Sequence, residues 1–151
     1  MNKFRSNIFD WIAKRQAARQ IVMYPWQDIR SVVIVHEGLN VDDIVRQLKQ
    51  EGKHVDEWTM PDKKDICWLT AMPKKEIREA IQSRHYDLLI DLTQDSNITM
   101  QYMALYVKAG FKTGRNIGKQ IFDLSIDTPA QKTPKFLYEQ IVKYIQMFTQ
   151  R

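Results

Sequence analysis

The run YDLLIDL, at residues 86–92, is the sequence feature that most constrains the fold. Its Leu88, Leu89 and Ile90 are consecutive, so a strand here carries large apolar side chains on both faces. Such a strand has to be buried on both faces, which is typical of parallel sheets covered by helices. We therefore predict that this run is the central strand of an α/β sheet.

Similar short segments alternate with helical patterns along the chain. The strand candidates are SVVIVHE (31–37), HVDEWTM (54–60), ICWLT (66–70) as a further short one, FKTGR (111–115) and IFDLSID (121–127). Apolar residues at helical spacing predict helices between Asn40 and Gly52, in 73–85, in 98–110 and from Pro134 to Phe148. This alternation predicts an α/β fold, a three-layer sandwich with a mostly parallel, Rossmann-like sheet of about five strands.

Residues that suit helix ends support these boundaries. The expected N-caps are Asn40, Ser96 or Asn97, and Thr133, and the expected helix stops are Gly52 and Gly110. Polar residues at the end of the 86–92 strand therefore have a structural explanation as caps and turns.

The first 20 residues form a basic segment. Five basic residues outnumber one acidic residue there, Lys3, Arg5, Lys14, Arg15 and Arg19 against Asp10, so the segment holds +4 of the chain's net charge of +5. Apolar residues recur at helical spacing, at Phe4, Ile8, Trp11 and Ile12. We predict an amphipathic helix that precedes the sheet, with a basic polar face.

This helix has two interpretations. It can pack its apolar side on the domain and leave its charges in water, which is the usual fate of a charge run. It can instead bind a protein partner or an anionic membrane surface. We expect no specific nucleic acid binding. The predicted organisation is a basic leader helix and linker at 1–28 and a single α/β domain at 29–151.

Composition and cysteine content predict a cytoplasmic protein. The chain of 151 residues is 44% hydrophobic and 27% charged, as ordinary globular proteins are. Its one cysteine, Cys67, has no partner for an internal disulfide. The start of the chain lacks the apolar region of a signal peptide, and no run reaches the roughly 18 apolar residues of a membrane span.

Polar side chains follow the predicted strands at the edge where α/β sheets bind ligands. The candidate ligand-binding residues are His36, Glu37, Asp91, Thr93, Lys112 and Arg115. Carboxylates, an imidazole and two cations in one crevice would suit a small ligand or a sugar phosphate. The competing interpretation assigns these residues to caps, turns and surface charges.

The common catalytic motifs are missing from the sequence. The turn after residues 31–37 reads HEGLNVDD, without the glycine patterns that hold pyrophosphate. The chain also lacks G-x-S-x-G, H-E-x-x-H and C-x-x-C. We therefore predict no catalytic residue, no metal ligand and no cofactor, and we favour a non-catalytic binding or scaffold module over an enzyme.

Two local resemblances concern residues 85–115. HYDLLIDLTQ resembles the central strand of bacterial response-regulator receiver domains, which implies phosphate acceptance at Asp91, but His36 and Glu37 stand where a receiver has an acidic pair. YDLLIDL with YMALYVKAGFKTGR resembles the N-terminal half-domain of heptosyltransferase-type glycosyltransferases. Those enzymes bind their substrates between two domains, so this resemblance implies a reduced half-domain.

A third resemblance extends over nearly the whole chain. The segments IFDWIAKR, CWLTAMPK, YDLLIDLT, AGFKTGR and FDLSID are similar to those of a family of small uncharacterised bacterial α/β proteins. This resemblance implies the α/β fold and no particular activity.

Overall fold

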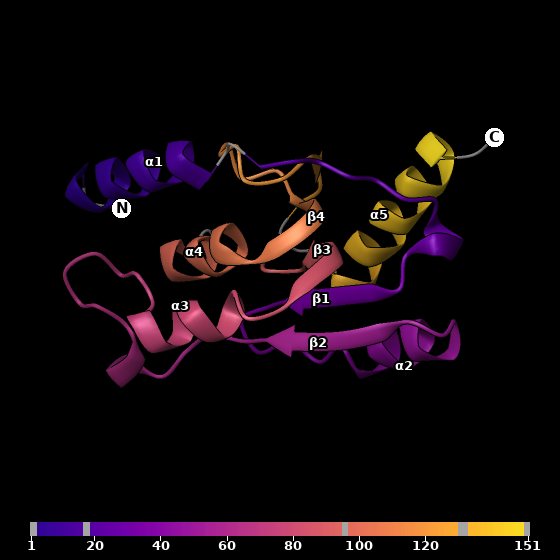
Figure 1. The fold of residues 1–151 in the computed structure, drawn as a ribbon, viewed down its shortest axis with the longest axis horizontal. Helices are drawn as coiled ribbons and strands as arrows, with labels where there is room; N and C mark the ends of the chain where they lie inside the picture. The colour runs from indigo at the N-terminus through magenta and orange to yellow at the C-terminus, as the bar shows by residue number, and fades with distance from the viewer. Residues whose placement is uncertain (1–2, 17–18, 95–96, 130–132, 150–151) are drawn as a thin grey trace.

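A computed structural model describes residues 3–16, 19–94, 97–129 and 133–149. Its elements, in chain order, are α1 (Lys3–Gln16), η1 (Trp26–Asp28), β1 (Ser31–Val35), α2 (Asp42–Gln50), β2 (His54–Trp58), η2 (Lys63–Asp65), α3 (Lys75–Ile81), β3 (His85–Asp91), α4 (Ile98–Tyr106), β4 (Lys108–Arg115), β5 (Leu124–Ile126) and α5 (Pro134–Thr149). The predicted α/β fold with a preceding N-terminal helix is confirmed (Figure 1).

All strand pairs in the sheet are parallel, and the order is β2-β1-β3-β4-β5. The chain moves outward from β1 to β2 and then returns to place β3 on the other side of β1. The strand order therefore reverses between β1 and β3, where doubly wound sheets leave a crevice at their carboxyl ends.

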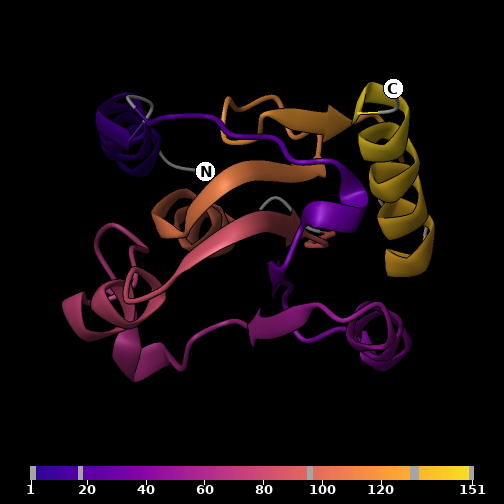
Figure 2. The same ribbon diagram turned by 45° about the vertical axis from the view of Figure 1, so that its right-hand side comes forward.

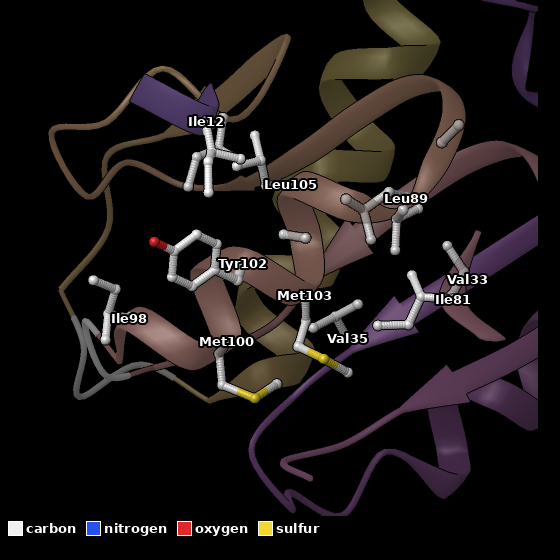
Figure 3. Close-up of a cluster of buried hydrophobic side chains, with 14 of the residues drawn as sticks. Ile12, Val33, Val35, Ile81, Leu89, Ile98, Met100, Tyr102, Met103 and Leu105 are labelled. Carbon is white, nitrogen blue, oxygen red and sulfur yellow. The ribbon is translucent and has the colours of Figure 1, made fainter. Parts of the chain in front are cut away.

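Helices cover both faces of the sheet (Figure 2). Successive residues of β1 point to opposite faces, so Val33 and Val35 join the core under α3 and α4, while Val32 and Ile34 join the core under α2 and α5. Figure 3 shows the first core, in which Met103 of α4 lies beside the sheet residue Val35. These two cores make the three layers.

Helix α1 packs on α4, outside the layer that α4 forms on the sheet. Its buried residues are Phe9 and Ile12, whereas Phe4 and Trp11 are exposed. The predicted apolar side of the helix is therefore wrong for Phe4 and Trp11, which are not buried. The cause is tertiary: Phe9 contacts Tyr102 of α4, and this contact turns Phe4 and Trp11 to the edge of the interface.

Two further expectations are corrected. Residues 66–70 form no strand. Ile66 makes only an isolated antiparallel bridge with Pro73. Gly110 does not end a helix, since α4 ends at Tyr106 and Gly110 lies within β4. The linker crosses β4 there: the Val22 N–H donates to the Gly110 carbonyl at 2.9 Å, and a Cβ on Gly110 would lie 3.0 Å from the Val22 oxygen.

Two of the expected N-caps are confirmed. The Asn97 side chain accepts the Met100 N–H at the start of α4, and the Thr133 hydroxyl accepts the Phe136 N–H at the start of α5. The alternative cap, Ser96, lies outside the described residues. The Asn40 side chain accepts the Asp42 N–H, although the N-cap position of α2 falls on Val41.

Candidate functional site

The carboxyl end of β3 places two polar side chains inside the protein. Asp91 is the last residue of β3, and only 5% of its surface is exposed. Its Oδ1 accepts the Thr93 N–H at 2.8 Å, a short local bond that turns the chain away from the sheet. Thr93 is 9% exposed, and its hydroxyl interacts with the Asp91 carboxyl but forms no hydrogen bond of good geometry within the described ranges.

Arg115 and Gln101 complete this polar group. Arg115 ends β4, next to β3, and Gln101 projects from α4. The Arg115 Nε and Nη2 atoms and the Gln101 Oε1 atom are buried, and no partner is found for them in the part of the chain that the structure describes. Together with Ile117 and Phe122, these side chains line a cavity of about 10 Å³.

Burial controls the protonation of Asp91. It raises the pKa of this carboxyl to about 6, and the nearby Glu37 charge acts in the same direction. Interaction with Thr93 and the positive charge of Arg115 oppose the rise in pKa. Asp91 therefore changes its charge near neutral pH.

His36 does not line the cavity. Its Nδ1 accepts the N–H groups of Gly38 and Leu39, at 3.1 and 2.9 Å, so the hydrogen of the neutral ring lies on Nε2. Nε2 lies 3.2 Å from a carboxylate oxygen of Glu57 in β2. These contacts fix the loop that follows β1, so His36 has a structural role here.

Glu37 lies beside the cavity and holds together the two loops next to it. Its two carboxylate oxygens lie 2.9 and 3.0 Å from the Gln94 backbone nitrogen, whose N–H they accept. This contact joins the loop after β1 to the loop after β3, across the point where the strand order reverses. Glu37 thus acts on the site through position and charge.

Lys112 is placed elsewhere. It lies opposite Leu89 in mid-strand, and its ammonium group donates to the carbonyls of Ala104 and Leu105, both at 2.9 Å. These are among the last carbonyls of α4, which have no partner within a helix, so Lys112 caps α4. Burial lowers the pKa of Lys112 to about 7, and the charge of Arg19 lowers it further.

The structure thus brings together three of the six predicted residues, Asp91, Thr93 and Arg115, with Glu37 adjacent. Gln101 was missed. A signal was present, because Gln101 and Thr99 are the only hydrogen-bonding side chains besides the tyrosines in the buried helix ITMQYMALY. A polar side chain in a helix that is buried all round needs a partner or a function.

A second feature lies on the outside of the protein. The Arg5 guanidinium of α1 donates to the carbonyls of Trp68 at 2.5 Å and Leu69 at 3.3 Å, which holds the loop before α3 against the N-terminal end of α1 (Figure 1). Trp68 is 81% exposed, and Leu69 is exposed as well. The adjacent Phe4 is also exposed on α1.

Trp11 extends this feature along α1. It follows Phe4 by seven residues, which places both side chains on the same side of the helix. The guanidinium of Arg15 lies 4.9 Å from the centre of the Trp11 ring. We refer to Phe4, Trp11, Trp68 and Leu69 as the apolar surface.

Positive charge surrounds the apolar surface. Helix α1 holds four basic residues and one acidic residue, and residues 62–75 hold four lysines (Lys63, Lys64, Lys74 and Lys75) and two aspartates (Asp62 and Asp65). The excess of five positive charges equals the net charge of the whole chain. The remaining residues are therefore neutral in sum.

No group of three or more His, Cys, Asp or Glu side chains that could hold a metal ion occurs among the described residues. None of the helices described is both long enough and apolar enough to cross a membrane.

The fold and this cavity define an α/β protein with a doubly wound parallel sheet and a polar site at its carboxyl edge. The model of a family of unknown function (DUF6913) matches residues 34–148, more than half of the chain. The chain belongs to this family. No curated protein and no solved structure matches it.

Proposed function

We propose that this chain is a non-catalytic binding module that docks on an anionic membrane surface through the apolar surface of Phe4, Trp11, Trp68 and Leu69. The observation that carries the proposal is the 81% exposure of Trp68, in a loop that Arg5 fixes to α1. A large aromatic side chain held in water by the fold costs free energy that contact with an apolar phase recovers.

The residue types suit the interface of a bilayer. Tryptophan rings concentrate at the level of the lipid headgroups, because the ring is apolar and its N–H still reaches water or a headgroup. Leu69 and Phe4 add further exposed apolar area. Arg5 holds the loop and the helix together, so little conformational entropy is lost on binding.

The charge around the apolar surface favours anionic lipid. Each Lys or Arg near an anionic leaflet contributes about 1 kcal/mol of attraction, which salt screens. Lys3 and Lys14 of α1 are exposed, and Lys63 and Lys64 are exposed in η2 beside the loop. The combination of apolar insertion and charge is what stable reversible membrane binding requires.

The cavity at β3 does not favour catalysis by itself. Its described lining holds a carboxyl, a guanidinium, a hydroxyl and an amide, and no imidazole or thiol faces it within those residues. A base beside a nucleophile is the usual arrangement for covalent catalysis. This composition supports a binding role over an enzymatic one.

Vesicle flotation of the full chain tests the proposal. We expect binding to vesicles of phosphatidylcholine with phosphatidylserine and little binding to phosphatidylcholine alone, because the charge requires an anionic surface. Trp68→Ala should weaken binding to the anionic vesicles roughly tenfold, the equivalent of about 1.4 kcal/mol of lost insertion.

Phe148→Ala is the matched control. Phe148 is 59% exposed on α5, which covers the other face of the sheet, so its loss lowers surface hydrophobicity without touching the apolar surface. It should bind vesicles as the unmodified chain does. Equal binding by the Trp68 and Phe148 variants, or no binding to anionic vesicles at all, would contradict the proposal.

A further inference from the structure

The cavity between Asp91, Thr93, Gln101 and Arg115 contains buried polar atoms that no described residue satisfies. Thr93 and Gln101 are 9% and 5% exposed, and each has an oxygen that lacks a partner in the described ranges. The Nε and Nη2 atoms of Arg115 form the side edge of its guanidinium, and both are buried without a described partner. Arg115 as a whole is partly exposed, but these two N–H groups are shielded from water and lack a protein acceptor, which is unfavourable unless an oxygen of a ligand accepts them.

Asp91 does not pair with Arg115 by direct contact. Its charge acts on Arg115 across the cavity, yet the two groups form no ion pair within 4.0 Å. A carboxyl and a guanidinium that face one small space without touching leave room for a third group between them. The cavity lies at the carboxyl ends of the neighbouring strands β3 and β4, the edge of the sheet at which α/β proteins bind ligands.

The chemistry of the lining specifies the group. Arg115 only donates, and its edge matches two oxygens of one oxyanion. The Gln101 Oε1 atom only accepts, as does an ionised Asp91, while the Thr93 hydroxyl can do either. A ligand that satisfies all four must present at least two acceptor oxygens and one hydroxyl donor.

We propose that this cavity binds a small oxyanion that carries a hydroxyl group, of the phosphate class, between Arg115 and Gln101. Arg115 holds two of its oxygens, Thr93 bonds a third, and the hydroxyl donates to Gln101 or Asp91. The proposal is independent of membrane docking, because none of these residues belongs to the apolar surface.

Phe122 controls access to this site. A space of about 10 Å³ is near the minimum that one water molecule needs, so a phosphate enters only when the lining moves. The ring of Phe122, in the connection from β4 to β5, lines the cavity and is partly exposed, and it packs on Gly114, where a Cβ would lie 2.6 Å from it. Its displacement opens the site without a change in the sheet.

Thermal unfolding of the full chain in matched salts tests the site. Inorganic phosphate should raise the Tm, and sulfate, which has the same shape without the proton, should bind roughly tenfold more weakly or worse, because it leaves Gln101 unpaired. Glycerol phosphate distinguishes the source: a response to it as well indicates a terminal phosphate group, and a response to inorganic phosphate alone indicates the free ion.

Variants locate the effect. Arg115→Met should abolish the response to phosphate while remaining folded, since it removes two buried N–H groups that have no described partner and keeps a long side chain. Arg46→Met removes the same charge from the exposed face of α2 and should respond as the unmodified chain does. Phe122→Ala should bind phosphate several-fold more tightly, because no ring has to be displaced.

Two results would overturn the proposal. If phosphate and sulfate shift the Tm equally, the hydroxyl is not recognised and Gln101 does not act as an acceptor. If phosphate shifts the unmodified chain and Arg115→Met equally, or shifts neither, the cavity holds only water.

Discussion

The ring of Phe9 in α1 packs edge-on against the ring of Tyr102 in α4, with their centroids 4.9 Å apart. This contact joins the N-terminal helix to the layer that covers the sheet. Phe9 is 1% exposed, so it contributes as a core residue although it lies outside the segment that the family model matches.

Phe9→Ala should therefore destabilise the protein. Loss of a buried phenylalanine typically costs about 3–5 kcal/mol of unfolding free energy. Urea denaturation followed by circular dichroism measures this change. Trp11→Ala, an exposed aromatic on the same helix, should cost no more than about 0.5 kcal/mol. Equal effects of the two substitutions would mean that α1 is not packed as described.

Asp91→Asn should stabilise the protein above pH 6. Because burial raises the pKa of Asp91 to about 6, from 3.8, the folded state binds a proton more tightly than the unfolded state, and stability falls as pH rises between these values. The asparagine keeps the acceptor for the Thr93 N–H and has no charge to bury. The gain should reach at most about 3 kcal/mol at pH 8 and vanish near pH 4.

The measurement is a series of urea titrations from pH 4 to pH 8. Asp43→Asn, on the exposed face of α2, is the control and should follow the unmodified chain. A gain from Asp91→Asn that is the same at both ends of the series would show that Asp91 is ionised throughout.

Lys112 should make stability rise with pH over a different range. Burial lowers its pKa to about 7, so between pH 7 and its unfolded value of 10.5 the unfolded state holds the extra proton. The unfolding free energy of the native chain should therefore increase from pH 7 towards pH 10. Lys112→Met should lose this increase, whatever its effect at pH 7 from the two uncapped carbonyls. Exposed Lys49→Met should keep the increase.

The fold was predictable because buried strands leave a strong trace in sequence. Leu88, Leu89 and Ile90 are all fully buried, and they require helices on both sides. The strand order does not follow from such a pattern. It depends on which side of β1 the third strand joins, and local residues do not encode that choice.

Part of the candidate site could be predicted from the sequence, because its residues lie at strand ends. Asp91, Thr93 and Arg115 meet because parallel strands bring their carboxyl ends to one edge. The strand expected at 111–115 would put Lys112 at the same edge of the sheet. In the structure β4 begins at Lys108, so Lys112 lies in the middle of the strand, under α4.

The exposed apolar side chains of α1 and of the loop before α3 could not be predicted from the sequence. Positions 4 and 11 lie on one stripe of the helix and positions 9 and 12 on the next, and only the contact with Tyr102 decides which stripe is buried. The apolar residues of ICWLT (66–70) indicate a strand, whereas the Trp68 side chain is exposed to solvent. Exposure of this kind is set by tertiary contacts such as that of Arg5.

Gly114→Ala should disturb the closure of the polar cavity. A Cβ at this position would lie within 3.0 Å of three atoms of the Phe122 ring, so the ring has to move. We expect a loss of about 1–3 kcal/mol, as for other overpacked sites. In the double variant with Phe122→Ala the two effects should not add, because the clash is gone. Additive losses in urea denaturation would show that the two residues do not touch.

Arg5→Met should weaken vesicle binding by more than the loss of one charge. Arg5 donates to the carbonyls of Trp68 and Leu69, so its removal frees the loop as well as lowering the charge. Lys14→Met removes one charge from an exposed position of α1 and measures the charge effect alone. The Arg5 variant should bind anionic vesicles several-fold more weakly than the Lys14 variant, and amide hydrogen exchange in the 66–71 loop should be faster in the Arg5 variant only. If both variants lose the same affinity and exchange at the same rate, the link from Arg5 does not organise the surface and charge alone accounts for its effect.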